Sequence, residues 1–330
     1  MTKTKTMTTR HQDLLLLDKH AVESLLSMDD ALAATREAFV LHSRQQGRVF
    51  QVVRERLEGG GIFGIKSGDV PTQALLGFKA AGFWPDNRNI GAEPHQATIM
   101  LIDPLTGRPT CMIDGNAITT MRTGAAGGLG LELLARTDSR NVCVFGTGVQ
   151  ARIQLTFALR MFSSIEKVRY VTSNGKDDEA FESLFRERCN ISLAPERNAA
   201  VEQSDIVITA TPGRGPLFDP HAVRPGTHLN CVGADTKGKR ELPEALLERV
   251  RLFVDDAGQA TQIGEAQWAP EIRAIELGAV LDGKVRVERQ REDITVFDMT
   301  GLALQDLTVA SLLRERAVQK KVGTSIAWPW

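Results

Sequence analysis

The sequence is short of cysteine, lacks a long apolar run and has no excess of either charge. Its four cysteines, Cys111, Cys143, Cys189 and Cys231, have neither the density of a disulfide scaffold nor a CxxC spacing, so we expect reduced thiols and a cytoplasmic location. No stretch approaches the roughly 20 apolar residues that span a bilayer, and Asp18 and Lys19 interrupt the first apolar run at once. We therefore expect neither secretion nor a membrane partner.

The charge balance also excludes classes of function. The formal net charge of -1 provides no surplus of cations to neutralise phosphates, so a nucleic acid is not an expected partner. The six histidines show no metal-ligand spacing, and His95 and His228 lie beside strands where a structural imidazole is the simpler interpretation. We predict no metal site. Ser163, Ser164 and Ser204 have no plausible base nearby in the sequence, which argues against a nucleophilic hydrolase.

A chain of 330 residues is long enough for two domains. Residues 1–10 are expected to form a disordered tail, and Ser27 to cap a helix that runs to about Gln45. Short apolar runs then predict an antiparallel sheet with strands at Val49–Val53, Gly61–Ile65, Leu75–Phe83 and Ala97–Ile102.

The pattern changes after Thr120. A helix rich in small residues is expected at Gly124–Leu134, and strands then alternate with helices, which predicts a doubly wound parallel sheet of the Rossmann type. The last helix, about Ala303–Lys320, could fold back onto the first domain. The expected strands are Val142–Phe145, Val168–Thr172, Ile191–Leu193, Asp205–Ala210, His228–Val232, Leu252–Val254 and Ile294–Phe297.

The first turn of this region carries a phosphate-binding pattern. Directly after the apolar strand come Gly146-Thr147-Gly148-Val149-Gln150-Ala151, which is G-x-G-x-x-A. Gly146 permits the tight turn, Gly148 lets the backbone approach a pyrophosphate, and Ala151 allows close packing of helix on strand. The helix N-terminus would bind the phosphates of a dinucleotide. A turn that merely needs two glycines is the simpler alternative.

The end of the next strand bears on which nicotinamide cofactor binds. An acidic residue there would hold the ribose hydroxyls of NAD and repel the extra phosphate of NADP. This sequence instead has Thr172 and Ser173, with Lys176 nearby. We therefore expect NAD(P)(H), with NADP favoured, unless the segment is a plain polar loop.

A series of short motifs runs along nearly the whole chain. They are Val53-Arg54, Gly77-Phe78-Lys79, His95-Gln96-Ala97, Asp114-Gly115-Asn116, Thr120-Met121-Arg122-Thr123, Gly146 to Ala151, His228 to Asp235 and Phe297 to Ala303. Taken in order, these motifs resemble the ornithine cyclodeaminase and mu-crystallin family. Within the family, the stretch from Val52 to Asn87 looks most like the iminosuccinate reductases. The resemblance implies a homodimer built through the N-terminal sheet.

The resemblance implies a domain division and a set of site residues. Residues 1–121 and 303–330 would bind substrate and form the dimer, and residues 122–302 would bind the dinucleotide. Arg54, Lys79 and Arg122 would hold an α-carboxylate, which an arginine fork and a lysine charge suit chemically. The cofactor site would include Thr123, Gly146, Thr147, Gly148, Val149, Gln150, Thr172, Ser173, Lys176, Thr211, Val232 and Gly301.

By the same resemblance, Asp235 would face the substrate nitrogen and act with Lys79 as a catalytic residue. An anion beside the nitrogen favours the protonated imine, which is already an electrophile. Asp235 could instead be a helix N-cap, and the three cations could be surface charges. A Schiff base at Lys79 is not supported, because nothing in the sequence marks its pKa as lowered.

The substrate class depends on Lys66. Ornithine cyclodeaminases carry an acidic residue thirteen positions before the carboxylate-binding lysine, and here that position is Lys66. A lysine would repel an ammonium and attract a second carboxylate, unless it simply points to solvent. The expected activity is imino-acid reduction by NAD(P)H, with iminosuccinate to aspartate as the best guess. A cyclodeaminase-type lyase with tightly bound NAD, a cyclic-ketimine reductase and a crystallin-like binding protein remain alternatives.

Overall fold

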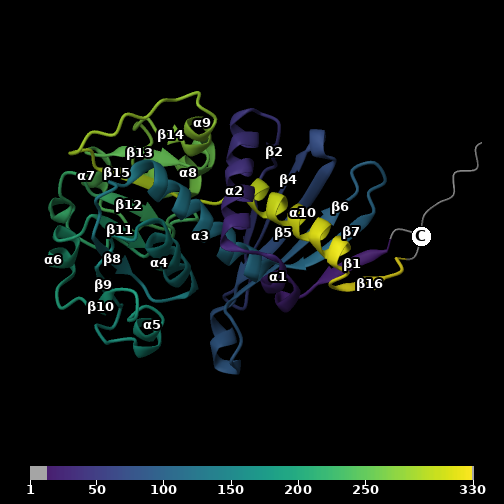
Figure 1. Cartoon of the computed structure of the whole chain (residues 1–330), viewed down its shortest axis with the longest axis horizontal. Helices are drawn as coiled ribbons and strands as arrows, with labels where there is room; N and C mark the ends of the chain where they lie inside the picture. The colour runs from purple at the N-terminus through teal and green to yellow at the C-terminus, as the bar shows by residue number, and fades with distance from the viewer. Residues whose placement is uncertain (1–12, 329–330) are drawn as a thin grey trace, which may run out of the picture.

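The computed structural model describes residues 13–328 and contains two sheets of eight strands each (Figure 1). The tail expected at residues 1–10 lies outside the described residues. Among those described, no helix is long and apolar enough to cross a membrane. The two sheets lie side by side, each with its own helices, and the C-terminal helix α10 (Ala303–Lys320) packs on the first sheet.

The first sheet is antiparallel except for one parallel pair. Its order is β16-β1-β7-β6-β5-β4-β2, β3 also pairs with β4, and β1 runs parallel to β7. The strands are β1 (Leu14–Leu17), β2 (Arg48–Val49), β3 (Val53–Arg56), β4 (Ile62–Val70), β5 (Leu75–Phe83), β6 (His95–Ile102), β7 (Pro109–Asp114) and β16 (Thr324–Ile326). Two 3-10 turns, Pro71–Gln73 and Pro85–Ile90, follow β4 and β5.

The expected single strand Val49–Val53 is wrong. Val49 pairs with Gly68 of β4, and Val53 pairs with Ile65. Between these two residue pairs, the segment from Val49 to Val53 therefore contains one more residue than β4 does. The extra residue cannot join the ladder, so the strand breaks into β2 and β3 with a bulge between them.

One face of the first sheet is covered by helices α1 (Lys19–Leu25), α2 (Met28–Ser43) and α10. Ser27 is confirmed as the N-cap of α2, in a capping box with Asp30. Val22, Ile99, Ile113 and Leu307 are at most 1% exposed in the core between sheet and helices. This packing fixes α10 against β4 and β5, the strands that carry Lys66 and Lys79.

The second sheet is parallel throughout, in the order β10-β9-β8-β11-β12-β15-β13-β14. Each expected strand is found with ends shifted by a residue or so, and the doubly wound α/β class is confirmed. The strands are β8 (Asn141–Phe145), β9 (Lys167–Val171), β10 (Asn190–Leu193), β11 (Ile206–Thr209), β12 (His228–Cys231), β13 (Arg251–Val254), β14 (Ile275–Glu276) and β15 (Thr295–Asp298).

Short helices connect most of these strands. Strand order reverses between β8 and β11, because the chain runs outward from β8 to β10 and then returns to the other side of β8. The helices are α4 (Val149–Met161), α5 (Glu179–Ser183), α6 (Arg197–Glu202), α7 (Glu244–Leu247), α8 (Ala257–Ile263) and α9 (Leu277–Leu281), with 3-10 turns at Pro220–Ala222 and Glu265–Trp268.

One helix, α3 (Gly115–Leu134), joins the two sheets and is longer than the expected Gly124–Leu134. Its N-cap is Asp114, whose carboxylate accepts from the backbone N–H of Ala117 at 2.9 Å. A β carbon at Gly127 would lie 1.9 Å from Gln154 Oε1 of α4, and one at Gly130 would lie 2.6 Å from the ring of Phe297. These glycines remain because α4 and β15 pack too closely for a side chain, although glycine lowers helix propensity.

Candidate active site

A cleft of about 1460 Å³ is lined by residues of both sheets. It includes the carboxyl end of β8 and the segment after β11, where the strand order reverses and where open α/β sheets bind their ligands. Every site residue proposed from the sequence lines this cleft: Arg54, Lys66, Lys79, Arg122, Thr123, Gly146, Thr147, Gly148, Val149, Gln150, Thr172, Ser173, Lys176, Thr211, Val232, Asp235 and Gly301. Their individual roles stay predictions.

Gly146 shapes the turn after β8. Its φ of +97° lies in the left-handed region, and a β carbon would lie 2.7 Å from the carbonyl oxygen of Ala210. Its N–H donates to the carbonyl of Val171 at 2.9 Å. Glycine is therefore required here by the protein's own backbone, with or without a ligand.

Gly148 is different, because nothing in the protein fills the space beside it. It is the N-cap of α4, no side chain caps that helix, and a β carbon would meet no atom within 4 Å. Within the described chain, Gln150 Oε1 is buried and has no hydrogen-bond partner. An uncapped helix N-terminus and an open approach to the backbone together fit a dinucleotide pyrophosphate, whereas the Gln150 oxygen, which can only accept, fits a hydroxyl donor.

The far end of the cleft surrounds the tip of β9. Thr172 Oγ1 donates to the carbonyl of Lys176 at 2.7 Å, which closes the loop. Asp177 and Asp178, which the sequence analysis did not consider, also line the cleft. The Asp178 carboxylate accepts from the N–H of Phe181 at 2.9 Å and so caps α5.

Four cations converge at the opposite end of the cleft. Lys66 on β4 and Lys79 on β5 are direct cross-strand neighbours, Arg54 lies on β3 and Arg122 on α3. Lys66, Lys79 and Arg122 are 9%, 5% and 8% exposed. Buried like charges are costly unless anions or acceptors offset them, so the partners of these side chains define the chemistry of this end.

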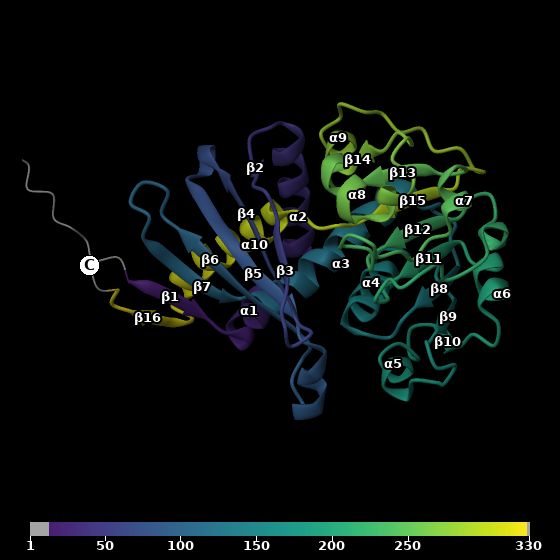
Figure 2. The ribbon, with the colours of Figure 1, turned by 180° about the vertical axis from the view of Figure 1, so that it is seen from behind.

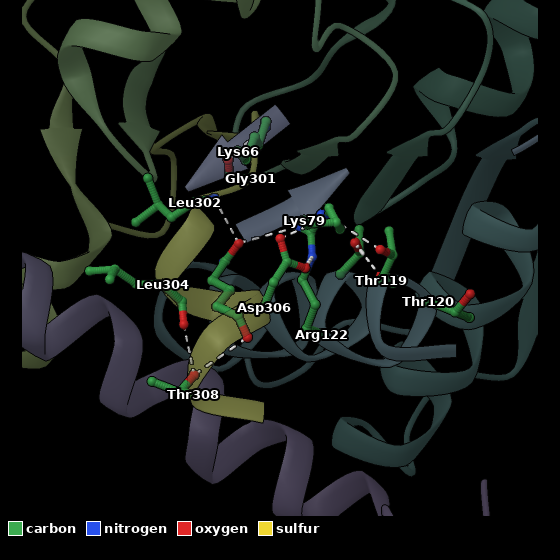
Figure 3. A network of polar contacts seen from close by, with 12 residues as sticks. Lys66, Lys79, Thr119, Thr120, Arg122, Gly301, Leu302, Leu304, Asp306 and Thr308 are labelled. Atoms are coloured by element: carbon green, nitrogen blue, oxygen red, sulfur yellow. Dashed lines mark hydrogen bonds and ion pairs between the residues drawn. The ribbon is translucent and has the colours of Figure 1, made fainter. Parts of the chain in front are cut away.

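The main partner is Asp306, which the sequence analysis missed (Figure 3). Its Oδ2 lies 2.8 Å from Lys79 Nζ, and its Oδ1 accepts from Arg122 Nε at 3.1 Å. Gln305 Oε1 accepts from Arg122 Nη1 at 3.2 Å, and Thr119 Oγ1 accepts from Lys79 at 3.2 Å. Asp306 lies in the first turn of α10. From the sequence alone, an acidic residue at this position is explained by its favourable interaction with the helix dipole.

Burial lowers the pKa of Lys79 to about 7; Arg122 and Lys66 add to the shift, and Asp306 opposes it. Our sequence-based argument that nothing marks this pKa as lowered is therefore wrong. The cause is tertiary, since the lysine is enclosed by α3 and α10 and faces two other cations. An ammonium with this pKa exchanges its proton near neutral pH.

Lys66 does not point to solvent, so that alternative is wrong. Its Nζ donates to the carbonyl oxygens of Thr300 at 2.7 Å and Gly301 at 2.8 Å. Burial lowers its pKa to about 8, and the charges of Arg122 and Arg54 add to the shift. An ammonium has three N–H groups, so one remains for a ligand in the cleft.

Asp235 follows β12 and is partly exposed in the cleft. Its Oδ1 accepts from Lys239 Nζ at 2.6 Å, and Arg54 Nη2 lies 3.4 Å from its backbone oxygen. Burial raises the pKa of Asp235, but Lys239, Arg54 and Lys66 outweigh burial and hold the pKa well below its usual range. The N-cap alternative is wrong, because the next helix, α7, begins at Glu244 with Pro243 as its N-cap.

The two histidines that lie beside strands, His228 and His95, have different surroundings. His228 is fully buried between Thr295 Oγ1 and Asn230 Oδ1, each 2.9 Å away, which confirms a structural imidazole. His95 lines the cleft, and its Nδ1 lies 2.9 Å from Asn116 Oδ1.

Within the described part of the chain, one group has metal-like spacing: His42, Asp256 and Glu276. Both carboxylates already accept backbone N–H groups near the start of α8, from Gln259 and Ala257. The absence of a metal stays a prediction.

Comparisons with known proteins agree with this geometry. The model of the ornithine cyclodeaminase/mu-crystallin family matches residues 12–321. An archaeal alanine dehydrogenase dimer with bound NAD is 33% identical, covers 96% of this chain and 100% of its own, and has a TM-score of 0.89. Δ1-pyrroline-2-carboxylate reductase of Thermococcus litoralis, solved with NADH and L-proline, has 30% identity, coverages of 94% and 100%, and a TM-score of 0.88.

A third structure is the iminosuccinate reductase of Paracoccus denitrificans in complex with NAD+. It is 31% identical, covers 95% of this chain and 99% of its own, and has a TM-score of 0.87. The chain belongs to the ornithine cyclodeaminase/mu-crystallin family, as its motifs predicted.

Gly148→Val tests the dinucleotide site. We expect at least about a 100-fold loss of affinity for NADH and NADPH in calorimetry with an unchanged melting temperature, because the side chain enters open space that the pyrophosphate needs. Gly146→Val is the matched comparison, since its positive φ and the Ala210 oxygen predict a folding defect instead. A folded Gly148→Val protein with wild-type affinity would remove the G-x-G-x-x-A turn from the site.

Proposed function

We propose that the protein is a nicotinamide-dependent oxidoreductase that acts on the C=N bond of imino acids or, in reverse, on the CH–NH bond of amino acids. The observation that supports this is a single cleft holding a dinucleotide turn, a cluster of buried cations and an ionised Asp235. The related structures hold NAD or NADH. Reduction of iminosuccinate to aspartate is the activity that the cation cluster favours.

Each charged group has a distinct part in the proposed reaction. Lys79 and Arg122 would bind the α-carboxylate, which fixes the imine carbon for hydride transfer. Asp235 would accept a hydrogen bond from the imine nitrogen and keep it protonated, so that the carbon remains electrophilic. The bound nicotinamide supplies or accepts the hydride.

The proton balance assigns a role to Lys79. Hydride addition to an iminium leaves a neutral amine, and Asp235 is too acidic to supply the next proton. Lys79, with a pKa near 7, can exchange a proton at neutral pH. We therefore propose that Lys79 and Asp235 are the two catalytic residues.

A substrate with two carboxylates suits the charges around Lys66. Arg54, Lys66, Lys79 and Arg122 together repel the second ammonium of a diamino acid, which argues against a cyclodeaminase-type lyase. Lys66 keeps one N–H for a distal carboxylate. Reduction of a cyclic ketimine is the second candidate, because the T. litoralis reductase, 30% identical, holds L-proline.

The preference between NAD and NADP rests on the tip of β9. Thr172, Ser173 and Lys176 line the cleft there, and Arg197 lies close by in the same lining. Asp178 is already engaged as the cap of α5. We propose that this subsite admits the 2′-phosphate of NADP as well as NAD. The cytoplasmic location inferred from the cysteines stays a prediction.

A homodimer is proposed through the uncovered face of the first sheet, which Figure 2 shows in front of α10. Leu16, Met112, Met100 and Phe78 are cross-strand neighbours from β1 to β5, and all four are only partly buried. A continuous apolar row of this kind is typical of an interface, and two-fold pairs are the commonest oligomers. The archaeal alanine dehydrogenase relative is a dimer.

Light scattering tests the dimer. We expect twice the chain mass of 36.1 kDa at micromolar concentration. Met100→Glu should shift the protein toward monomer, because it buries a charge in the row. Thr261→Glu is the control, since Thr261 is exposed on α8, beside the second sheet and away from the row. A wild-type monomer would contradict the proposal.

Asp235→Asn tests the chemistry. We expect unchanged affinity for NADH and a fall in turnover of roughly two or more orders of magnitude, the usual scale for losing a positioned charge. Asp219→Asn, an exposed capping residue outside the cleft, should retain full activity. Turnover of Asp235→Asn within about threefold of wild type would exclude Asp235 from the reaction.

Lys66→Gln tests the substrate class. Gln can still donate to the carbonyls of Thr300 and Gly301 but has no charge, so any loss of packing affects all substrates alike. A charge-assisted contact contributes about 1.5–3 kcal/mol, so kcat/KM for iminosuccinate should fall roughly 10- to 150-fold. The imine of pyruvate should lose much less, because it has no distal carboxylate. A ratio of the two efficiencies that stays constant within about threefold would contradict recognition by Lys66.

A further inference from the structure

Asp306 contacts the two cations of the proposed carboxylate site without reaching the cleft. It is 1% exposed and bridges Lys79 and Arg122. Both cations line the cleft, and so does its neighbour Gln305, whereas Asp306 is not among the lining residues. In Figure 3 its carboxylate lies between the two cationic side chains, on α10. The carboxylate therefore holds the cations from the side opposite to the substrate.

We propose that Asp306 is a positioning residue, the built-in counter-ion that orients Lys79 and Arg122 and keeps Lys79 charged for a substrate carboxylate. This inference rests on the proposed function, because it concerns the groups that would bind the substrate. Asp306 itself would touch neither substrate nor cofactor.

The hydrogen-bond geometry supports the orienting part of this role. Arg122 uses Nε for Asp306 and Nη1 for Gln305, which leaves its other terminal nitrogen free to turn toward the cleft. The Nζ of Lys79 pairs with Asp306 and donates to Thr119, so at least one of its three N–H groups remains for the cleft. The side chains cannot swing away, because each is tied on its buried side.

The charges around Lys79 support the other part of the proposal, that Asp306 keeps Lys79 charged. Asp306 of α10 is the anion in contact with it, whereas Arg122 of α3 and Lys66 of β4 are cations, and His95 of β6 faces the same group. Thr119 of α3 adds only a neutral oxygen. Burial raises the pKa of Asp306, but Lys79 and Arg122 outweigh it and hold the pKa below its usual value, so this residue is ionised.

Without that anion, Lys79 would lose its proton at a lower pH. Burial already brings the pKa of Lys79 to about 7 with Asp306 in place. An opposite charge at contact distance shifts a pKa by about 1–3 units toward the charged form, so removing it lowers the pKa by that amount. At neutral pH the site would then hold Arg122 beside an uncharged amine, and a carboxylate would bind more weakly.

Asp306→Asn is the direct test, because the amide keeps the shape and the oxygen that accepts from Arg122 but removes the charge. Competitive acetylation with acetic anhydride, followed by mass spectrometry of the Lys79 peptide, measures the pH at which this amine becomes reactive. The midpoint should fall by about 1–3 pH units. An unchanged midpoint would overturn the proposal, whatever the substrate.

Asp30→Asn is the matched control. Asp30 of α2 accepts from Arg316 Nη2 of α10 at 2.6 Å, so its loss loosens α10 without changing the charge beside Lys79. We expect the Lys79 midpoint to stay at its wild-type value. If Asp30→Asn shifted the midpoint as far as Asp306→Asn, loosening of α10 would explain the result and the proposal would be wrong.

Kinetics then separates this role from the proposed function. In Asp306→Asn, KM for the imine should rise at least about tenfold near pH 8 and less at lower pH, with NADH affinity unchanged. The value of kcat should also fall toward higher pH, because Lys79 would then lack the proton that it donates. An equal loss at every pH would overturn the counter-ion role. If Lys79→Gln leaves KM for the imine unchanged, the proposed carboxylate site fails, while the acetylation shift still supports Asp306 as the counter-ion.

Discussion

The arrangement of the cleft depends on how the segment Thr300–Gly301 is held between the two sheets. Lys66 donates to both carbonyls of this segment from the first sheet. From the second sheet, Asp255 accepts from Thr300 Oγ1 at 2.6 Å and from the N–H of Gly301. Gly301 has a φ of +81°, and a β carbon there would lie 2.8 Å from Arg122 Nη1. A larger residue would thus be strained and would displace a proposed substrate-binding arginine.

These buried charges are better explained by function than by stability. Replacing a buried ion pair with apolar residues is often neutral or stabilising, whereas removing one partner is strongly destabilising. Lys79, Arg122 and Asp306 could therefore be replaced together by a well-packed apolar core without loss of the fold. Lys79 and Arg122 also line a cleft open to ligands, where an apolar replacement would bind no carboxylate. The charges are retained where a ligand would use them.

Local patterns predicted the parts of the protein that local chemistry determines. The turn at Gly146 to Ala151, the N-cap at Ser27 and the apolar strands of the second sheet all depend on residues close together in sequence. Lys239 and Asp306 could not be assigned in this way. Lys239 contacts Asp235 within a loop, and Asp306 contacts Lys79 because α10 returns to the first sheet. Neither contact follows from a helix or strand pattern. The first half of α3 was missed for a similar reason, since Gly115 at its start fits there through close contact with Ala97 of β6, which is distant in sequence.

Within the described residues, the chain passes between the two sheets twice, through α3 on the way out and through the segment before α10 on the way back. The two sheets are also joined by packing that does not depend on these crossings. Phe39 of α2 is fully buried in one cluster with Leu277 of α9 and Phe297 of β15, and Arg44 beside α2 pairs with Asp282. The buried packing sets the distance between the cation cluster and the turn at Gly146 before any ligand arrives. Binding would therefore lose little free energy to reorganisation of the protein.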